Sequence, residues 1–252
     1  MRTKTVAGSA LAAVALIVAA SQVGPAAAAP VAVWALVSAL SLLFAAGWPR
    51  LFGLPAATQI AAVLGAAGLA AAAGAALAPM PQPLFWMAPA AAVGLILAFL
   101  VQLLRGTGEK LRLESMLSSA TGALVVASGS GWIALDRIAG TAAESSLMVA
   151  AGASMAAAIL VCTIRWPDRI VGPLAVVVAV LVGGLATLAF GTAPLLPALA
   201  VGAVSGAVIA GVRSLVVSSG GPRGTLAAIA TGLCAVLGSG TLAYFLERLL
   251  LG

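Results

Sequence analysis

The sequence predicts an all-helical bundle that crosses a membrane nine times, or eight times if the first segment is a cleaved signal peptide. The composition is the first observation: 63% of the 252 residues are hydrophobic and 7% are charged, whereas ordinary soluble domains are about half apolar and a quarter charged. The second is that apolar runs of nearly 20 residues recur from end to end, which is the length that spans a bilayer as a helix. The third is that charged residues lie at the ends of these runs.

The elements follow one another with proline, glycine, tryptophan or charged residues between them. Arg2 and Lys4 precede the first run, and the alanine-rich stretch after it contains Gly24 and Pro25. This pattern fits either a signal peptide or a retained first helix, and we favour retention because the apolar run is long for a signal. The predicted spans cover residues 6–23, 30–47, 55–77, 86–104, 116–135, 147–164, 173–190, 195–212 and 225–246.

The basic residues predict the orientation of the spans. If the N-terminus is cytoplasmic, only Arg137 and Arg248 of the 12 basic residues fall outside. Loops retained in the cytoplasm carry the excess of Lys and Arg, so this split favours a cytoplasmic N-terminus and a C-terminus outside. The predicted location is therefore the cell (cytoplasmic) membrane, as a multi-pass protein. The ten inner basic residues are Arg2, Lys4, Arg50, Arg105, Lys110, Arg112, Arg165, Arg169, Arg213 and Arg223.

Rare landmarks recur in the same order in both halves of the chain, and they indicate an internal duplication. They are Trp48-Pro49 with Trp166-Pro167, Ala120-Thr121-Gly122 with Ala230-Thr231-Gly232, Gly129-Ser130-Gly131 with Gly238-Ser239-Gly240, and Leu135-Asp136-Arg137 with Leu246-Glu247-Arg248. Four spans per copy is an even number, so both copies insert in the same sense, about an axis along the membrane normal. The predicted organisation is a first span or signal at 1–29, repeats at 30–137 and 147–252, and an outer linker at 138–146.

Three segments carry a resemblance to a known group of proteins. They are Gly47-Trp48-Pro49-Arg50-Leu51, Arg105-Gly106-Thr107-Gly108-Glu109 and Arg165-Trp166-Pro167-Asp168-Arg169. They resemble segments of uncharacterised integral membrane proteins of high-GC Gram-positive bacteria, sometimes labelled permeases. The resemblance implies neither a substrate nor functional residues.

The paired Gly-Ser-Gly elements are the predicted candidates for a solute site inside the membrane. Matched helix interruptions in two halves of a chain indicate a transporter site. The candidate solute-binding hydroxyls are Thr121, Ser130, Thr231 and Ser239. The alternative is tight helix packing, because Gly and Ser let neighbouring helices approach closely.

Four arginines at the predicted inner boundary are candidates for contact with lipid head groups or with an acidic partner. They are Arg50, Arg105, Arg169 and Arg213, which form two matched pairs. The alternative is that they act only as topology anchors.

The inventory of chemical groups argues against several functions. There is no His, and Cys162 and Cys234 lie far apart, so we expect no metal, no cofactor and no enzyme activity. No ionisable residue lies near the centre of a span, which argues against a carboxylate proton relay. The lipid bilayer is the expected partner, with other membrane subunits as a further candidate, and no nucleic acid is expected. The sequence favours permease-like movement of a small neutral or amphipathic solute; the alternative is a non-catalytic accessory or assembly subunit of a membrane complex.

Overall fold

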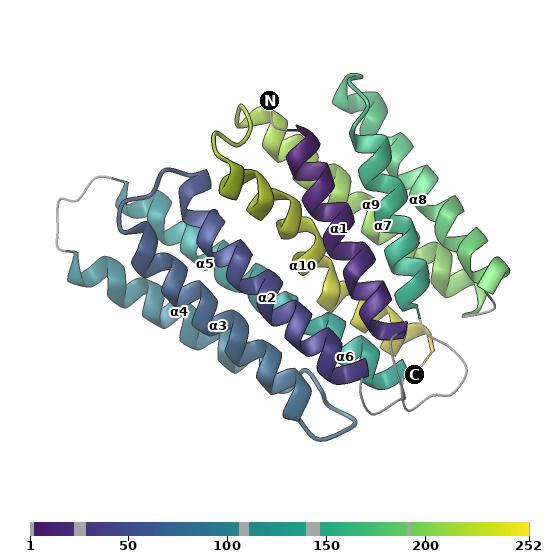
Figure 1. Cartoon of the computed structure of the whole chain (residues 1–252), viewed down its shortest axis with the longest axis horizontal. Coiled ribbons are helices and arrows are strands. Elements are labelled where there is room, and N and C mark those ends of the chain that lie inside the picture. Colours follow the sequence, from purple (N-terminus) through teal and green to yellow (C-terminus); the bar gives the residue numbers. More distant parts are fainter. Residues whose placement is uncertain (1–2, 23–28, 106–110, 140–146, 191–192, 252) are drawn as a thin grey trace.

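The computed structural model describes residues 3–22, 29–105, 111–139, 147–190 and 193–251, and these residues form ten helices and no strand (Figure 1). The predicted all-helical class is therefore confirmed. The alanine-rich segment 23–28, the charged loop 106–110 and residues 140–146 of the predicted linker lie outside the described residues. The helices are α1 (Thr3–Gln22), α2 (Ala29–Leu51), α3 (Ala57–Leu77), α4 (Met87–Leu104), α5 (Arg112–Ser128), α6 (Ser130–Ala139), α7 (Met148–Cys162), α8 (Asp168–Phe190), α9 (Leu195–Ser218) and α10 (Thr225–Leu250).

The helices match the predicted spans. Within the described residues, eight stretches are long and apolar enough to cross a membrane, α5 and α6 together forming one of them. Helix α7 is shorter, at 15 residues, but turn hydrogen bonds from Thr163 and Ile164 to the carbonyls of Leu160 and Val161 extend it. The chain is thus a multi-pass membrane helix bundle, and large apolar side chains such as Leu104 and Leu188 face outward from it.

Successive spans, with α5 and α6 counted as one, run in alternating directions, so that the start of α1 and the end of α10 lie at opposite ends of the bundle (Figure 1). The end where α1 starts is called the basic end here, and the other is the far end. Arg137 and Arg248 lie at the far end, near the ends of α6 and α10. The described basic residues of the basic end are Lys4, Arg50, Arg105, Arg112, Arg165, Arg169, Arg213 and Arg223.

The two Trp-Pro elements both lie at the basic end, but they play different structural roles. Pro49 lies in the last turn of α2, which Gly53 ends with a left-handed φ of 60°. Pro167 instead starts α8, because its carbonyl accepts the N–H groups of Ile170 and Val171. Trp48 is buried and its indole donates to the Ser118 carbonyl at 2.8 Å, whereas Trp166 is exposed.

Helix α10 runs through the middle of the bundle and touches α6 with almost no side chain between the two backbones. A Cβ added at Gly131 would lie 2.2 Å from the Thr241 nitrogen and 2.3 Å from the Gly240 carbonyl carbon. The two Gly-Ser-Gly elements are therefore in contact. Between helices in lipid there is no hydrophobic driving force, so this close approach is itself a main source of packing energy.

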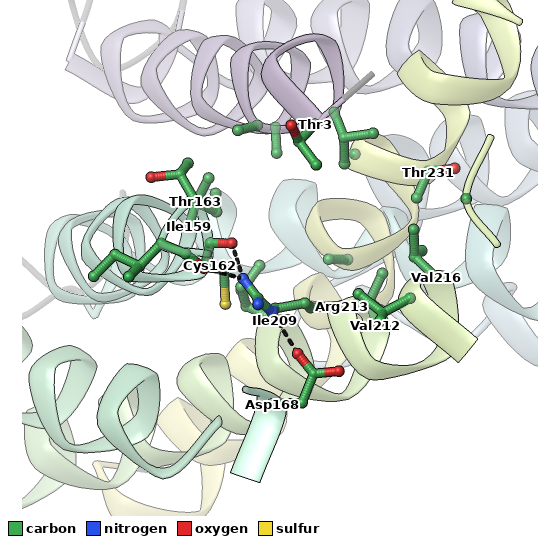
Figure 2. Close-up of a pocket in the computed structure, with 18 of the residues that line it drawn as sticks. Thr3, Ile159, Cys162, Thr163, Asp168, Ile209, Val212, Arg213, Val216 and Thr231 are labelled. Atoms are coloured by element: carbon green, nitrogen blue, oxygen red, sulfur yellow. Dashed lines mark hydrogen bonds and ion pairs between the residues drawn. The ribbon is translucent and has the colours of Figure 1, made fainter. Parts of the chain in front are cut away.

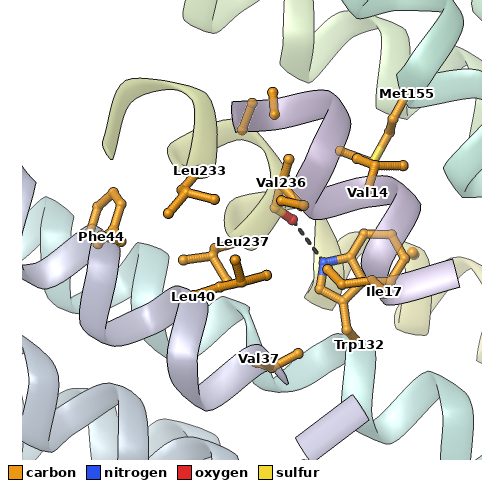
Figure 3. Close-up of a cluster of buried hydrophobic side chains, with 14 of the residues drawn as sticks. Val14, Ile17, Val37, Leu40, Phe44, Trp132, Met155, Leu233, Val236 and Leu237 are labelled. Atoms are coloured by element: carbon orange, nitrogen blue, oxygen red, sulfur yellow. Dashed lines mark hydrogen bonds between the residues drawn. The ribbon is translucent and has the colours of Figure 1, made fainter. Parts of the chain in front are cut away.

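Two hydrogen bonds cross the same contact in opposite directions. The Trp132 indole of α6 donates to the Val236 carbonyl of α10 at 2.8 Å (Figure 3). The Thr241 hydroxyl of α10 donates to the Ser128 carbonyl at 3.0 Å, where α5 gives way to α6. Figure 3 shows Val14 and Ile17 of α1 in the same buried cluster as Trp132.

Charged side chains at the far end bind the ends of neighbouring helices. The Arg137 guanidinium donates to the carbonyls of Ala75 and Ala78 at 2.6 and 2.9 Å, at the C-terminus of α3. The Glu247 carboxylate accepts the Leu147 backbone N–H at 3.0 Å, at the N-terminus of α7. Each charge has the sign that the helix dipole favours at that terminus.

The duplication remains a prediction. In its favour, α2 and α7 both start at the far end and run toward the basic end (Figure 1). The packing inside the two groups differs, however. Among the described residues α7 packs on α9, whereas α2 has no comparable packing on α4. Likewise α3 packs on α5 and α6, whereas α8 has no comparable packing on α10.

Replacing Gly131 with alanine is expected to destabilise the bundle, and replacing Gly238 with alanine is not. The Gly131→Ala methyl group meets rigid backbone of α10, so a loss of about 1–3 kcal/mol is expected. Nothing lies within 4 Å of a Cβ at Gly238, and alanine favours a helix over glycine by up to about 1 kcal/mol. The measurement is the temperature of half-unfolding in mild detergent. Equal unfolding temperatures for the two variants would contradict the close α6–α10 contact.

Candidate functional site

A cavity of about 630 Å³ opens at the basic end of the bundle, between α1, α7, α9 and α10 (Figure 2). The five-residue link between α7 and α8 forms its rim. A volume of this size lies within the range typical of small-molecule sites, which is roughly 300–1,000 Å³. Figure 2 shows that the labelled side chains come from all of these elements, with Thr3 on one side and Asp168 on the other.

The rim is held in shape by Arg213 of α9. Its Nε donates to the Asp168 carboxylate at 2.9 Å. Its Nη1 donates to the carbonyls of Cys162 and Ile164, and its Nη2 donates to the Trp166 carbonyl. One guanidinium thus satisfies three carbonyls that α7 and its link leave without helical partners, together with the one described acidic side chain of the rim.

The sequence explains why the link presents these carbonyls. Pro167 cannot continue α7, since it lacks an N–H donor and disfavours helical backbone in the residue before it. The chain therefore leaves α7 at Cys162 and starts again at Asp168. Asp168 then sits in the first turn of α8, where the helix dipole favours a negative charge.

The deeper walls of the cavity are apolar. Helix α1 contributes Val6, Ala7 and Ala10, and α9 contributes Ile209 and Val212. The cavity therefore combines a polar, charged rim with an apolar interior. This arrangement suits an amphipathic molecule, because its polar group stays at the rim while its apolar part leaves water.

Helix α1 forms a wall of the cavity because α10 has a glycine at the crossing point. A Cβ at Gly232 would lie 2.3 Å from the Ser9 hydroxyl and 2.5 Å from the Val6 carbonyl oxygen. At the matched position in the first half, a Cβ at Gly122 would meet the Trp48 ring at 2.8 Å. Gly232 of α10 thus receives α1, whereas Gly122 of α5 receives a tryptophan of α2.

The structure brings Ser130 and Ser239 to the α6–α10 contact, but it turns their hydroxyls back toward their own helices. Ser130 donates to the Ala127 carbonyl at 2.6 Å, and Ser239 donates to the Val236 carbonyl at 2.9 Å. Both side chains are buried. The helix break expected at each element is present only in the first, because α10 continues through Gly238-Ser239-Gly240 without interruption. The packing alternative describes these elements better.

The two threonines of the predicted set differ. Thr121 is exposed on the outside of the bundle and donates to the Leu117 carbonyl. Thr231 is buried, donates to the Ala227 carbonyl at 2.8 Å and lines the cavity. Thr231 is therefore the one residue of the predicted hydroxyl set that lies at the cavity described here.

The four predicted arginines do not form one cluster. Arg213 lines the cavity, and Arg169 is exposed one residue beyond the rim. Arg50 lies at the end of α2 and donates to the Ala46 carbonyl. Arg105 lies at the end of α4, and its Nη1 donates to Gln102 at 2.8 Å.

Sequence reasoning missed Arg165, Asp168 and the α1 side chains as parts of a site. Arg165 lines the cavity, but it has no matching residue in the first half and so was not selected. Asp168 carried a usable signal: it occupies the position after Trp-Pro that is Arg50 in the first half. The α1 residues carried none, because Val6, Ala7 and Ala10 look like any membrane-facing residues.

Across the described ranges, no three His, Cys, Asp or Glu side chains lie close enough together to hold a metal ion.

Replacing Arg213 is expected to loosen the rim. An Arg213→Met variant leaves three carbonyls and the Asp168 carboxylate without their donor, and hydrogen bonds to charged groups contribute about 1.5–3 kcal/mol each before water replaces part of them. The measurements are the temperature of half-unfolding and protease cleavage at residues 163–167. Arg223→Met, at an exposed position of the same end, is the matched control. Identical behaviour of the two variants would show that Arg213 does not hold the link.

No protein-family model matches this chain, and no match was found among curated proteins or solved structures.

Proposed function

We propose that this protein is a permease-like component of the cytoplasmic membrane that binds a small amphipathic solute in the cavity at the basic end and moves it across the bilayer. The cavity is the observation that carries the proposal. Its charged rim and apolar interior favour an amphipathic solute over a fully neutral, polar one. The hydrogen bonds that hold the rim leave its interior open between four helices.

The basic end is the cytoplasmic end in this proposal. Eight described basic residues lie there and two lie at the far end, which is the asymmetry expected of cytoplasmic loops. The C-terminus then lies outside. The cavity accordingly takes its solute from the cytoplasm or from the inner leaflet.

Beyond the cavity, toward the far end, α10 packs closely on its neighbours. One turn beyond the cavity-lining Ala235, Ser239 is bonded to Val236 and lies 3.4 Å from the Met155 sulfur. Transport therefore requires α10 to move relative to α7 or α6, in the manner of alternating access between two halves.

Filling the cavity is expected to abolish solute movement. Val212→Trp places an indole into the cavity from α9, whereas Leu215→Trp places the same group on the outer face of the same helix, where Leu215 is exposed. The assay follows a fluorescently labelled fatty acid and a labelled zwitterionic single-chain lipid across proteoliposome membranes. We expect Val212→Trp to lower protein-dependent flux by about tenfold or more, which corresponds to about 1.4 kcal/mol, and Leu215→Trp to keep it.

Flux equal to that of empty vesicles for both probes with the parent protein would overturn the proposal. So would flux that Val212→Trp and Leu215→Trp reduce equally.

The second candidate is an accessory or assembly subunit, and the close packing of α10 on α6 favours it. The α6–α10 contact has the backbone-to-backbone closeness of a fixed structural joint, and the hydroxyls beside it are bonded within their own helices. Purification in mild detergent followed by mass spectrometry tests this candidate. A membrane partner in fixed stoichiometry, together with no flux, would favour it over the permease.

A further inference from the structure

We infer that the cavity selects an anionic amphiphile, a single-chain molecule whose carboxylate or phosphate is bound by the guanidinium of Arg165 while its chain lies against α1, α9 and α10. The inference rests on the proposed function and names the class of its solute.

Most polar groups of the cavity are already committed to partners within the protein. Arg213 makes four hydrogen bonds to the rim, and these include its ion pair with Asp168. The Thr163 hydroxyl donates to the Leu160 carbonyl at 2.7 Å, and the Thr231 hydroxyl donates to the Ala227 carbonyl. These groups shape the site, and most of their donor hydrogens are used: Arg213 keeps only one of its five N–H groups, on Nη2.

Arg165 is different. It lines the cavity, it is exposed, and within the described part of the chain its guanidinium has neither an ion-pair nor a hydrogen-bond partner. Its N–H donors are therefore available to a ligand at the rim. A guanidinium matches the geometry of carboxylate and phosphate oxygens, which it binds in a bidentate manner.

The electrostatics of the rim favour a negative head group. Asp168 and Arg213 neutralise each other, so the cavity keeps the positive charge of Arg165. Exposed Lys4, Arg169 and Arg223 stand beside the rim in sequence, next to the lining residues Thr3, Asp168 and Pro222. A basic pocket between membrane helices on the cytoplasmic side is a recognised site for phosphate head groups.

The interior of the cavity selects for an apolar chain. Val6 and Ala10 of α1, Ile159 of α7 and Ile209 of α9 line it, and the Thr231 hydroxyl donates to its own helix. A volume of about 630 Å³ suits one chain with its head group. A guanidinium recognises a carboxylate and a phosphate by the same chemistry. The head group then distinguishes a free fatty acid, which carries a carboxylate, from a phospholipid, which carries a phosphate.

The test measures binding of three probes with the same oleoyl chain to the full-length protein in nanodiscs of zwitterionic lipid. The probes are oleate, oleoyl lysophosphatidic acid and oleoyl lysophosphatidylcholine, each displacing a fluorescent fatty acid. We expect at least one anionic probe to bind about tenfold or more tightly than the zwitterionic one. Tighter binding of oleate identifies a fatty acid, and tighter binding of lysophosphatidic acid identifies a phospholipid. The preference should weaken as salt is raised, because Arg165 is exposed.

Three variants connect the preference to Arg165. Arg165→Gln should abolish it, Arg165→Lys should keep most of it because the charge remains, and Arg50→Gln, at an exposed position that does not line the cavity, should leave it unchanged. Equal affinities for all three probes, or equal effects of the Gln substitutions at Arg165 and Arg50, would overturn the inference while leaving amphiphile transport intact. Absence of binding for every probe, combined with absence of flux, would overturn the proposed function as well.

Discussion

The fold depends on the contact between α6 and α10, where two glycines bring backbone against backbone. In water, burying apolar surface holds helices together, but in a bilayer the lipid is as apolar as the helix interior. Close van der Waals contact and hydrogen bonds that lipid cannot offer have to supply the difference. The Gly131–Gly240 approach provides the first. The Trp132 indole, which donates to a carbonyl of α10, and the Thr241 hydroxyl, which donates to the Ser128 carbonyl at the end of α5, provide the second.

The cavity exists because the second half is not packed like the first. Trp48 fills the space beside Gly122, and it is anchored there by its bond to Ser118. Beside Gly232 the space belongs to α1, whose Ser9 and Val6 backbone approach the glycine. Trp166 is consequently left outside, and the space between α1 and α9 remains unfilled. Gly122 thus receives a tryptophan ring, whereas Gly232 receives α1, which also forms a wall of the cavity.

The sequence was sufficient to predict the class of fold and the spans, because each span must satisfy its backbone internally and must be about 20 apolar residues long. It was not sufficient to predict which faces meet. Trp48 and Trp166 stand in similar local sequences, each followed by proline, yet Trp48 is buried and Trp166 is exposed. Ser130 and Ser239 were predicted as binding groups. The sequence of a serine between two glycines does not show whether its hydroxyl faces a solute or the preceding helical turn. Only the structure shows that Thr231 lines the cavity. Arg165 and Asp168 line it as well, because Arg213 of α9 holds the link between α7 and α8 in place.

The bond between the Glu247 carboxylate and the Leu147 backbone N–H joins positions 100 residues apart. During synthesis, helix α7 therefore enters the bilayer long before the carboxylate that caps it has been translated. Until then its first turn has to find another acceptor at the membrane surface. The helices are therefore inserted in a different order from that in which their contacts form. The first turn of α7 obtains this acceptor only after α10 has been inserted.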